Sequence, residues 1–258
     1  MVDGSWYLPG SGRNAAAEYA EGHIPGAVFF DLDASSDRET SLPHMLPSAA
    51  DFASRMSRLG LHDTDDIIVY DGSGANLSAA RVWWTFRVFG HRRVAVLDGG
   101  MGKWRSEHRP LERGIVTRPP GQLTAKFDRE SVRDLKAMQT NLIDSREQVV
   151  DLRPAGRFQG TDPEPRAGVR RGHLPGSRNL PFTELVNADG TILPESELRR
   201  RLAAAGVDLS QPIVATCGSG TSACSLVLAL ELLGHTNTAV YDGAWTEWGG
   251  RPDTPVEL

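Results

Sequence analysis

Apolar residues along this chain fall into short runs that alternate with longer segments of helical character. The run 212–216 ends at a glycine-rich turn, as is typical of a short strand buried in a parallel sheet. A helix-like segment follows at 222–233 and ends at a Gly-His pair, where glycine suits the left-handed helix cap. A further strand-like run follows at 239–241, and the order strand, helix, strand predicts parallel pairing through a right-handed crossover. The same succession occurs earlier, at 66–70, 79–89 and 94–97.

This succession is one part of an internal repeat. Four motifs recur in the same order, and the offset between the two copies drifts only from 150 to 144 residues. The matched positions are 22–26 with 172–176, 71–74 with 217–220, 90–91 with 234–235, and 98–100 with 242–244. A period this long exceeds that of solenoid repeats, so it predicts two domains of one fold.

The repeat and the alternation of strands with helices predict an α/β protein of two tandem domains, each a small parallel sheet flanked by helices on both faces. We expect the first domain over 1–110 and the second over 127–258, joined by a linker rich in proline and glycine at 111–126. Ser131, followed by Asp134, predicts a helix start by a capping box. The second copy carries a helix and a strand ahead of the point where the first copy begins, so we expect the first domain to lack these elements.

Composition narrows the class of protein further. The 258 residues are 40% hydrophobic and 24% charged, which is ordinary for a globular protein and excludes wholesale disorder. The formal net charge of −5 argues against electrostatic binding of nucleic acid, and no apolar run approaches the roughly 18 residues of a membrane span. Residues 1–5 lack the basic start and apolar core of a signal peptide. Two cysteines exclude a disulfide scaffold, and we expect a reducing compartment, the cytoplasm.

Cys217 lies where a predicted strand ends and a predicted helix begins, and Gly-Ser-Gly-Thr-Ser follows it at 218–222. Two glycines let the backbone curl so that successive N–H groups point inward, and the helix N-terminus adds partial positive charge. Such a cradle stabilises a thiolate, which makes Cys217 a candidate nucleophile. A buried structural thiol is the alternative for a free cysteine, but two glycines after a buried strand expose the backbone instead of filling a core.

Neighbouring chemistries are disfavoured by what surrounds this loop. Cysteine phosphatases need an arginine six residues after the cysteine to grip the phosphate oxygens, and Ala223 stands there. Cys224 lies two helical turns beyond Cys217 within an apolar stripe, so we interpret it as a core thiol, with a resolving or redox role as the alternative. Neither cysteine has metal-ligand spacing with a histidine, and we therefore expect no metal site.

These features resemble the rhodanese family of sulfurtransferases. The resemblance rests on the tandem repeat, the paired Gly-His-x-Pro-Gly motifs and the Cys-Gly-Ser-Gly-Thr loop, and it extends from 5–9 to the tail at 248–253. It implies two rhodanese-like domains of which only the second is catalytic, because Asp71 stands in the first copy where Cys217 stands in the second. His23 and His173 recur in both copies, so we interpret them as structural.

Substrate contacts follow from the same resemblance. The segment 157–166 resembles the substrate-binding segment of the family, and Arg157 and Arg166 match its two substrate arginines. The planar fork of arginine binds carboxylate and carbonyl oxygens with defined geometry, although either residue taken alone could be a solvated surface charge. The transferred sulfur is expected to lie against the loop at Gly218, Gly220, Thr221 and Ser222.

Three further residues are assigned by the resemblance alone. Ser219 matches a loop serine that relays protons at the substrate, and His44 and Asp33 match its partners. A histidine can move a proton and a carboxylate can orient it, so a Ser219-His44-Asp33 relay is chemically reasonable. A capping or turn role is the alternative for His44, which lies between prolines 43 and 47.

The reaction implied by the resemblance is transfer of sulfur from 3-mercaptopyruvate to an acceptor thiol, such as thioredoxin, or to cyanide. It would pass through a persulfide on Cys217, release pyruvate and need no cofactor. Thiosulfate-type members of the family usually carry basic side chains inside the loop, where this chain has Gly218, Ser219 and Gly220. Two alternatives remain open: a thiosulfate sulfurtransferase, and a non-catalytic module whose Cys217 carries persulfide or senses oxidation.

Overall fold

The computed structural model describes residues 1–258 and divides them into two compact units. Unit 1 comprises Met1–Arg38, Leu46–Asp128 and Val186–Ile192, and unit 2 comprises Glu39–Met45, Arg129–Leu185 and Leu193–Leu258. This division differs from the expected domains in two respects. Two short segments, 39–45 and 186–192, belong to the unit other than the one that their sequence position predicts. The expected linker, 111–126, belongs entirely to unit 1.

Residues 111–126 lie along unit 1 as a strap. Glu112 and His23 exchange two backbone hydrogen bonds of 2.9 Å, so the strap begins as a short antiparallel bridge. At Gly121 the backbone passes so close to its neighbour that a Cβ atom would lie 2.2 Å from Leu61 O. Gly121 therefore serves a close approach of two backbones, and the segment expected as a linker packs on unit 1.

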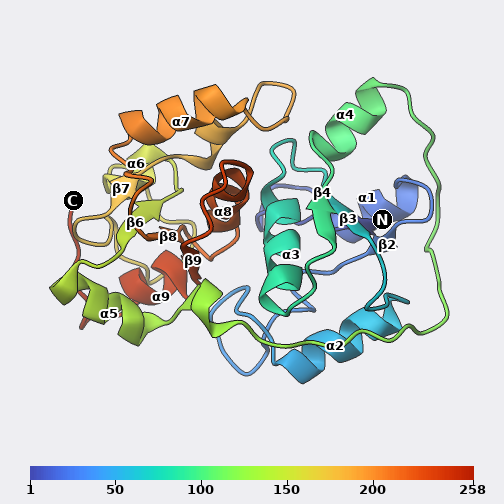
Figure 1. Ribbon diagram of the computed structural model, residues 1–258, viewed down its shortest axis with the longest axis horizontal. Coiled ribbons are helices and arrows are strands. Elements are labelled where there is room, and N and C mark those ends of the chain that lie inside the picture. Colours follow the sequence, from blue (N-terminus) through green and yellow to red (C-terminus); the bar gives the residue numbers. More distant parts are fainter. The chain divides into compact units, whose positions relative to one another are not determined.

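Unit 1 contains a four-stranded parallel sheet in the order β2-β1-β3-β4 (Figure 1). One face is covered by α2 and α3, where Phe52 stacks on Phe89 with ring centroids 4.4 Å apart. On the α4 side, Met101 packs with Ile24 and Tyr70. In chain order the elements are β1 (Val2–Asp3), α1 (Ala15–Glu21), β2 (Val28–Phe29), α2 (Ala49–Arg58), β3 (Ile67–Tyr70), α3 (Leu77–Val88), β4 (Val94–Val96) and α4 (Gly100–Ser106).

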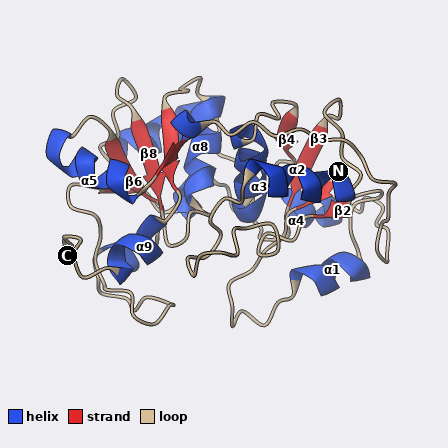
Figure 2. Cartoon of the chain, turned by 90° about the horizontal axis from the view of Figure 1, so that it is seen from below, coloured by secondary structure: helices blue, strands red, loops and turns tan.

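Unit 2 contains a five-stranded parallel sheet in the order β5-β9-β8-β6-β7. Trp245 and Trp248 of α9 pack with Met138 of α5 against Val214 of β8, so α5 and α9 share one face. Figure 2 shows α8 on the other side of these strands. The elements are a 3-10 turn (Arg129–Ser131), β5 (Val132–Arg133), α5 (Leu135–Asp144), β6 (Gln148–Asp151), α6 (Ala155–Phe158), β7 (Arg178–Asn179), a second 3-10 turn (Phe182–Leu185), α7 (Glu195–Ala204), β8 (Ile213–Thr216), α8 (Ala223–Leu232), β9 (Thr238–Tyr241) and α9 (Ala244–Gly250).

The two units confirm the predicted α/β architecture of parallel sheets flanked by helices. Strands β1 to β4 correspond in order to β6, β7, β8 and β9, whereas β5 and α5 have no counterpart in unit 1. The predicted helix start at Ser131 is wrong: the helix begins at Leu135, and the Asp134 side chain caps it by accepting a hydrogen bond of 2.8 Å from Ala137 N. The difference arises because the two residues after Ser131 pair with β9 as β5.

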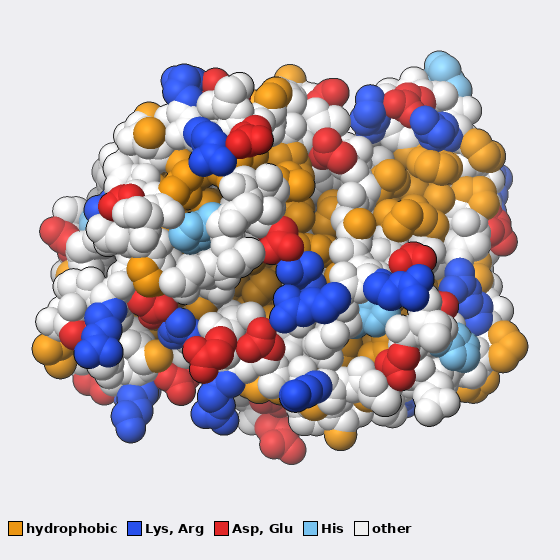
Figure 3. Space-filling model, viewed as in Figure 1, with side chains coloured by type: hydrophobic (Ala, Val, Ile, Leu, Met, Phe, Trp, Pro, Cys, Tyr) orange, Lys and Arg blue, Asp and Glu red, His pale blue; other side chains and the backbone are white.

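Two further features concern the charges on the surface and the apolar character of the helices. On the face drawn in Figure 3, Lys and Arg side chains are interspersed with Asp and Glu. None of the helices combines the length and the apolar character that crossing a bilayer requires.

Candidate functional site

Cys217 follows β8 directly, at the carboxyl edge of the parallel sheet in unit 2, which is where open α/β sheets bind their ligands. Only 2% of its surface is exposed. Its backbone carbonyl accepts a hydrogen bond of 2.9 Å from Trp245 N, at the start of α9. The side chain is a free thiol, and no hydrogen bond in the structure engages its Sγ atom. The residue is therefore held through its backbone while its sulfur stays available.

The loop after Cys217 is turned so that its amides face away from α9. The carbonyl of Gly218 accepts hydrogen bonds from Thr246 N at 2.9 Å and Thr246 Oγ1 at 2.6 Å. Because C=O and N–H point in opposite directions across a trans peptide, the N–H groups of Gly218 and Ser219 point away from α9. Gly220 completes the turn with a φ of +77°, and Ser222 makes no side-chain cap at the start of α8. The N–H groups of Gly218 and Ser219 are thereby directed away from α9, close to the N-terminus of α8.

His44 reaches this loop from the segment 39–45, which is part of unit 2. Its Nδ1 atom lies 2.9 Å from Ser219 Oγ and 3.1 Å from Thr221 Oγ1, and all three residues are buried. The backbone of His44 has a φ of +61°, a left-handed conformation that is uncommon outside glycine and often marks a functional position. The structure therefore brings together two of the residues expected to relay protons, although 175 positions separate them.

Arg157 lies at the end of α6 and over the loop. A Cβ atom at Gly218 would lie only 3.0 Å from Arg157 Nη2, so glycine lets the guanidinium approach the backbone. Arg157 Nη2 donates to Glu164 Oε2 at 2.5 Å, and the Glu164 side chain is 4% exposed. The Nε atom of Arg157 is buried without a hydrogen-bond partner. A buried unsatisfied donor beside a buried thiol is available to a ligand oxygen.

Glu164 and Arg153 complete this arrangement, and sequence reasoning missed both as site residues. Arg153, only 1% exposed, donates from Nη1 to Glu164 Oε1 at 2.8 Å and from Nη2 to Asp151 Oδ2 at 2.7 Å. Its guanidinium also lies 4.5 Å from the ring centroid of Trp245. Glu164 is thereby held from two sides and positions Arg157. The available signal was the motif Asp-Leu-Arg at the end of a buried strand, which places two charges where a core is expected.

For two expected site residues, Asp33 and Arg166, the assigned roles still rest on the sequence alone. Asp33 belongs to unit 1, where its carboxylate oxygens accept hydrogen bonds of 3.1 and 3.2 Å from Trp6 Nε1. Arg166 lies half-buried in the loop between α6 and β7 of unit 2. The third place in the proton relay and the second substrate arginine therefore stay predictions.

Cys224, His23 and His173 lie in packed surroundings that are consistent with structural roles. Cys224 is fully buried in α8, and its Sγ donates to Gly220 O at 3.4 Å. His23 and His173 occupy matching places: their Nδ1 atoms lie 2.9 Å from Tyr19 O and Phe158 O, and each ring stacks on that aromatic residue. The structure contains no group of three or more His, Cys, Asp or Glu side chains placed to hold a metal ion.

A buried cysteine in a glycine-turned loop, with a buried His-Ser pair near the same loop and an arginine over it, is the arrangement expected of a cysteine-dependent group-transfer enzyme. The family model described as Rhodanese-like domain matches residues 13–107 and 131–251. The chain therefore belongs to the rhodanese-like family, and it is a sulfurtransferase.

Individual relatives agree with this assignment. The chain is 47% identical to the 3-mercaptopyruvate sulfurtransferase of Rattus norvegicus over 249 residues, which is 96% of this chain and 84% of the relative. It is 44% identical to the thiosulfate/3-mercaptopyruvate sulfurtransferase 1, mitochondrial, of Arabidopsis thaliana over 278 residues, covering 100% of this chain and 73% of the relative. The crystal structure of SseA from Escherichia coli, a 3-mercaptopyruvate sulfotransferase with the rhodanese fold, matches with a TM-score of 0.87 and 42% identity over 95% of this chain and 91% of SseA.

Proposed function

We propose that this chain transfers sulfur from 3-mercaptopyruvate to an acceptor thiol, or to cyanide, through a persulfide on Cys217. The observation that carries the proposal is the separation of thiol and cation: the loop 218–222 has no charged side chain, and Arg157 lies over it with a free Nε–H. 3-Mercaptopyruvate has a matching layout, with an uncharged thiol at one end and a carboxylate and keto group at the other. The Rattus relative, named for this donor, supports the choice.

The first half of the reaction forms the persulfide. The thiolate of Cys217 attacks the sulfur of the donor, an S–S bond forms, and the C–S bond breaks. The electron pair of the C–S bond stays with carbon as an enolate, which takes a proton to become pyruvate. Arg157 and Arg166 hold the carboxylate and keto oxygens and stabilise the negative charge of the enolate. The amides of the loop 218–222 hold the persulfide.

The proton movements fall to the His44-Ser219 pair. His44 Nδ1 lies 2.9 Å from Ser219 Oγ, within the range for proton transfer. In the proposal, Ser219 exchanges protons with the donor and passes them to His44, which Asp33 orients. The buried position of both residues keeps bulk water from competing with the enolate for that proton.

The second half regenerates the enzyme. An acceptor thiolate, as in thioredoxin, or cyanide attacks the outer sulfur of the persulfide, and the Cys217 thiolate leaves. Neither displacement needs an external oxidant, reductant or cofactor, and the order of events predicts ping-pong kinetics. The thiolate form of Cys217 that starts each cycle fits a reducing compartment such as the cytoplasm.

Turnover of 3-mercaptopyruvate, followed as pyruvate release, tests the proposal. We expect a clear preference for 3-mercaptopyruvate over thiosulfate, and a mass increase of one sulfur atom on the intact protein after incubation with donor alone. Cys217→Ser is the matched control and should gain no mass. A sulfur adduct that persists in Cys217→Ser, or turnover unaffected by this change, contradicts the role of Cys217.

Thiosulfate is the second candidate donor, because the Arabidopsis relative is named for both substrates. Thiosulfate is a dianion, and Arg157 is the cation that would face it at the loop. The ratio of kcat/KM for the two donors decides between them: a ratio in favour of thiosulfate overturns the choice of 3-mercaptopyruvate and leaves the Cys217 persulfide in place.

A further inference from the structure

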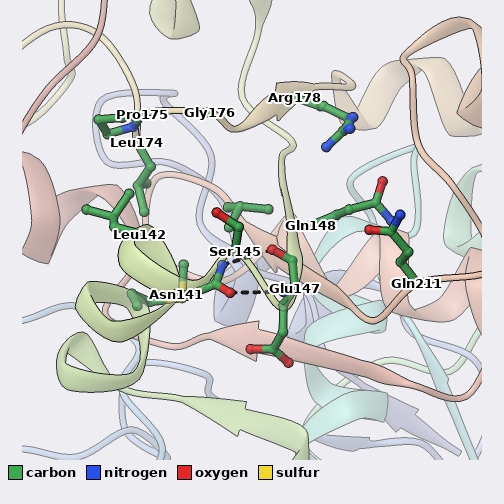
Figure 4. Close-up of a pocket in the computed structure, with 12 residues that line it drawn as sticks. Asn141, Leu142, Ser145, Glu147, Gln148, Leu174, Pro175, Gly176, Arg178 and Gln211 are labelled. Carbon is green, nitrogen blue, oxygen red and sulfur yellow. Dashed lines mark hydrogen bonds between the residues drawn. The ribbon is translucent and has the colours of Figure 1, made fainter.

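Unit 2 contains a cavity at the edge of its sheet opposite to the edge that carries Cys217. A cavity of about 430 Å³ is lined by the end of α5, the start of β6 and the turn before β7 (Figure 4). Gln148 begins β6 and Gln211 lies two residues before β8, whereas Cys217 follows β8. The cavity and the thiol are therefore separated by the length of the strands, about 13 Å for four residues. Its volume falls within the range of pockets that hold small organic ligands.

The two walls of this cavity differ in chemistry. Figure 4 shows Leu142, Leu174 and Pro175 on one side, and Gln148, Gln211 and Arg178 on the other. A ligand with an apolar body and one polar end would meet both walls in a single orientation.

Arg178 is the unpaired group of the polar wall. Its half-buried guanidinium makes no hydrogen bond and no ion pair in the structure. The amide of Gln148 is used in both directions by the Asp208 backbone, at 2.7 and 2.9 Å. The Asp208 carboxylate is itself held by Ser210 and Gln211, and Glu147 is paired with Arg133 at 2.7 Å. The pKa of Asp208 is lowered chiefly by the hydrogen bonds from Ser210 and to a lesser degree by the charge of Arg178, so Arg178 attracts this carboxylate without bonding to it. The N–H donors of Arg178 therefore stay without an acceptor.

The side of this cavity that carries Gly176 has a counterpart in unit 1, whereas α5, which lines another side, has none. Gly26 and Gly60 of unit 1 correspond to Gly176 and Gly206 of unit 2. In unit 1 the side chain of Arg118, from the strap 111–126, packs on Gly60, and its guanidinium donates to Gly26 O. In unit 2 Arg178 passes over Gly206 in the same way, with its Nε 3.4 Å from where a Cβ atom would lie, but no carbonyl meets its guanidinium.

We propose that this cavity binds a small organic anion, whose carboxylate pairs with Arg178 and whose apolar body lies against Leu142 and Leu174. Both units place an arginine over the corresponding glycine, Arg118 from the strap 111–126 in unit 1 and Arg178 from β7 in unit 2, and they differ in what meets the guanidinium. Unit 1 supplies a backbone oxygen from within, and unit 2 leaves the guanidinium for a ligand. A carboxylate suits this place because its two oxygens match the fork of arginine.

Binding of hexanoate to the full chain tests the proposal, with hexanamide as a neutral probe of the same size. In ¹⁵N-resolved NMR titrations we expect hexanoate to shift the amide signals of Gly176 and Arg178, and hexanamide to bind about tenfold more weakly, the value of one charge-assisted contact. Arg178→Gln should weaken hexanoate about tenfold and leave hexanamide unchanged. Arg171→Gln, which removes an exposed arginine elsewhere in unit 2, is the control and should change neither.

Three results would overturn the inference. Hexanoate and hexanamide could bind the unmodified protein equally well, which decides the matter even if Arg178→Gln does not fold. The signal shifts could instead be confined to the loop 217–222, which would show binding at the Cys217 site. Hexanoate could also shift no signal at all. Because binding is measured without sulfur transfer, failure here leaves the proposed function standing, and Cys217→Ser should bind hexanoate like the unmodified protein.

Discussion

The loops 71–76 and 217–222 have the same backbone design and different contents. Gly74 and Gly220 turn the two loops with φ values of +78° and +77°. The first carbonyl of each loop accepts a hydrogen bond of 2.9 Å from the following short helix, Asp71 O from Met101 N and Cys217 O from Trp245 N. The duplicated fold therefore builds the same amide-lined turn at the carboxyl edge of both sheets.

In unit 1 that turn is filled by its own anion. The Asp71 carboxylate, 1% exposed, accepts hydrogen bonds of 2.8 Å from Ser73 N and Ala79 N, and it also accepts from the hydroxyls of Ser73 and Ser78. It caps the N-terminus of α3 and satisfies its donors. In unit 2 no hydrogen bond engages Cys217 Sγ, and under the proposed function the loop amides bind the incoming sulfur. The comparison teaches that the same turn of backbone amides can hold a carboxylate of the chain as a structural cap in unit 1 and can serve as the proposed reactive site in unit 2.

Cys217→Asp would convert the second loop into the first. We expect the new carboxylate to take the loop amides, and turnover of 3-mercaptopyruvate to fall by about a thousandfold or more because the nucleophile is gone. Pyruvate release measures this effect. Cys224→Ser is the matched control, since it places at 224 the hydroxyl that Ser78 supplies in unit 1, and it should keep most of the activity. Turnover within tenfold of the unmodified protein would contradict the comparison.

The reverse change, Asp71→Cys, tests whether a cysteine suffices. It removes an acceptor that serves buried amides and hydroxyls, so we expect the free energy of unfolding to fall by about 3 kcal/mol, measured by chemical denaturation. Asp71→Asn keeps one acceptor oxygen and should cost less. In a Cys217→Ser background, donor should add no sulfur to the thiol introduced by Asp71→Cys, because Ala75 and Asn76 stand where unit 2 has Thr221 and Ser222. An adduct at position 71 would show that the loop backbone alone makes the site.

Glu164→Gln sharpens the comparison at Arg157, the arginine of α6 that lies over the loop 217–222. The change weakens the charge-assisted bond that holds Arg157, so we expect the KM for 3-mercaptopyruvate to rise about tenfold while kcat changes less. Glu197→Gln, at a surface ion pair on α7, is the control and should leave KM unchanged. A loss confined to kcat, or a drop in folded protein with an unchanged KM, would assign Glu164 to another role.

The smallest expected effect is a change in the pH dependence of stability, and it comes from comparing Asp3 with Asp151. They hold matching places in β1 and β6, but Asp151 is paired with Arg153 whereas Asp3 faces Ser5. Burial raises the pKa of Asp3 above its ordinary value, with hydrogen bonds from Ser5 opposing the shift. The folded state therefore binds this proton more tightly than the unfolded state, and stability falls as pH rises from the ordinary pKa through the raised one.

The measurement compares the unmodified protein with Asp3→Asn by urea denaturation at a series of pH values. The stability of the unmodified protein relative to Asp3→Asn should be greatest below the ordinary pKa of an aspartate and should decrease by about 1.4 kcal/mol for each unit by which the pKa is raised. A relative stability that increases with pH would mean that Asp3 is stabilised as a carboxylate in the folded state.

Much of the fold could be read from local patterns. Predicted helices at 79–89 and 222–233 correspond to Leu77–Val88 and Ala223–Leu232, because apolar runs ending at Gly-His pairs are local signals. Residues 111–126, expected as a linker, pack on unit 1. A backbone that needs glycine for close packing and a backbone that needs it for flexibility have the same composition, so the sequence did not distinguish the two. Ala244 shows the same limit: it adopts a φ of +51°, matching Gly100 at +50°, although alanine gives no local signal for that conformation.

By itself, the sequence determined the duplicated parallel α/β fold, the position of Cys217 at a strand-to-helix turn, and the difference between Cys217 and Asp71. These features follow from hydrophobic periodicity and from residues such as glycine that shape the backbone locally. Only the tertiary structure decided which side chains complete the site: the approach of His44 to Ser219, the hold of Arg153 and Glu164 on Arg157, and the unpaired charge of Arg178. The physical reason is that hydrogen bonds and ion pairs between distant residues depend on burial and distance in three dimensions, which neighbouring residues in the chain do not encode.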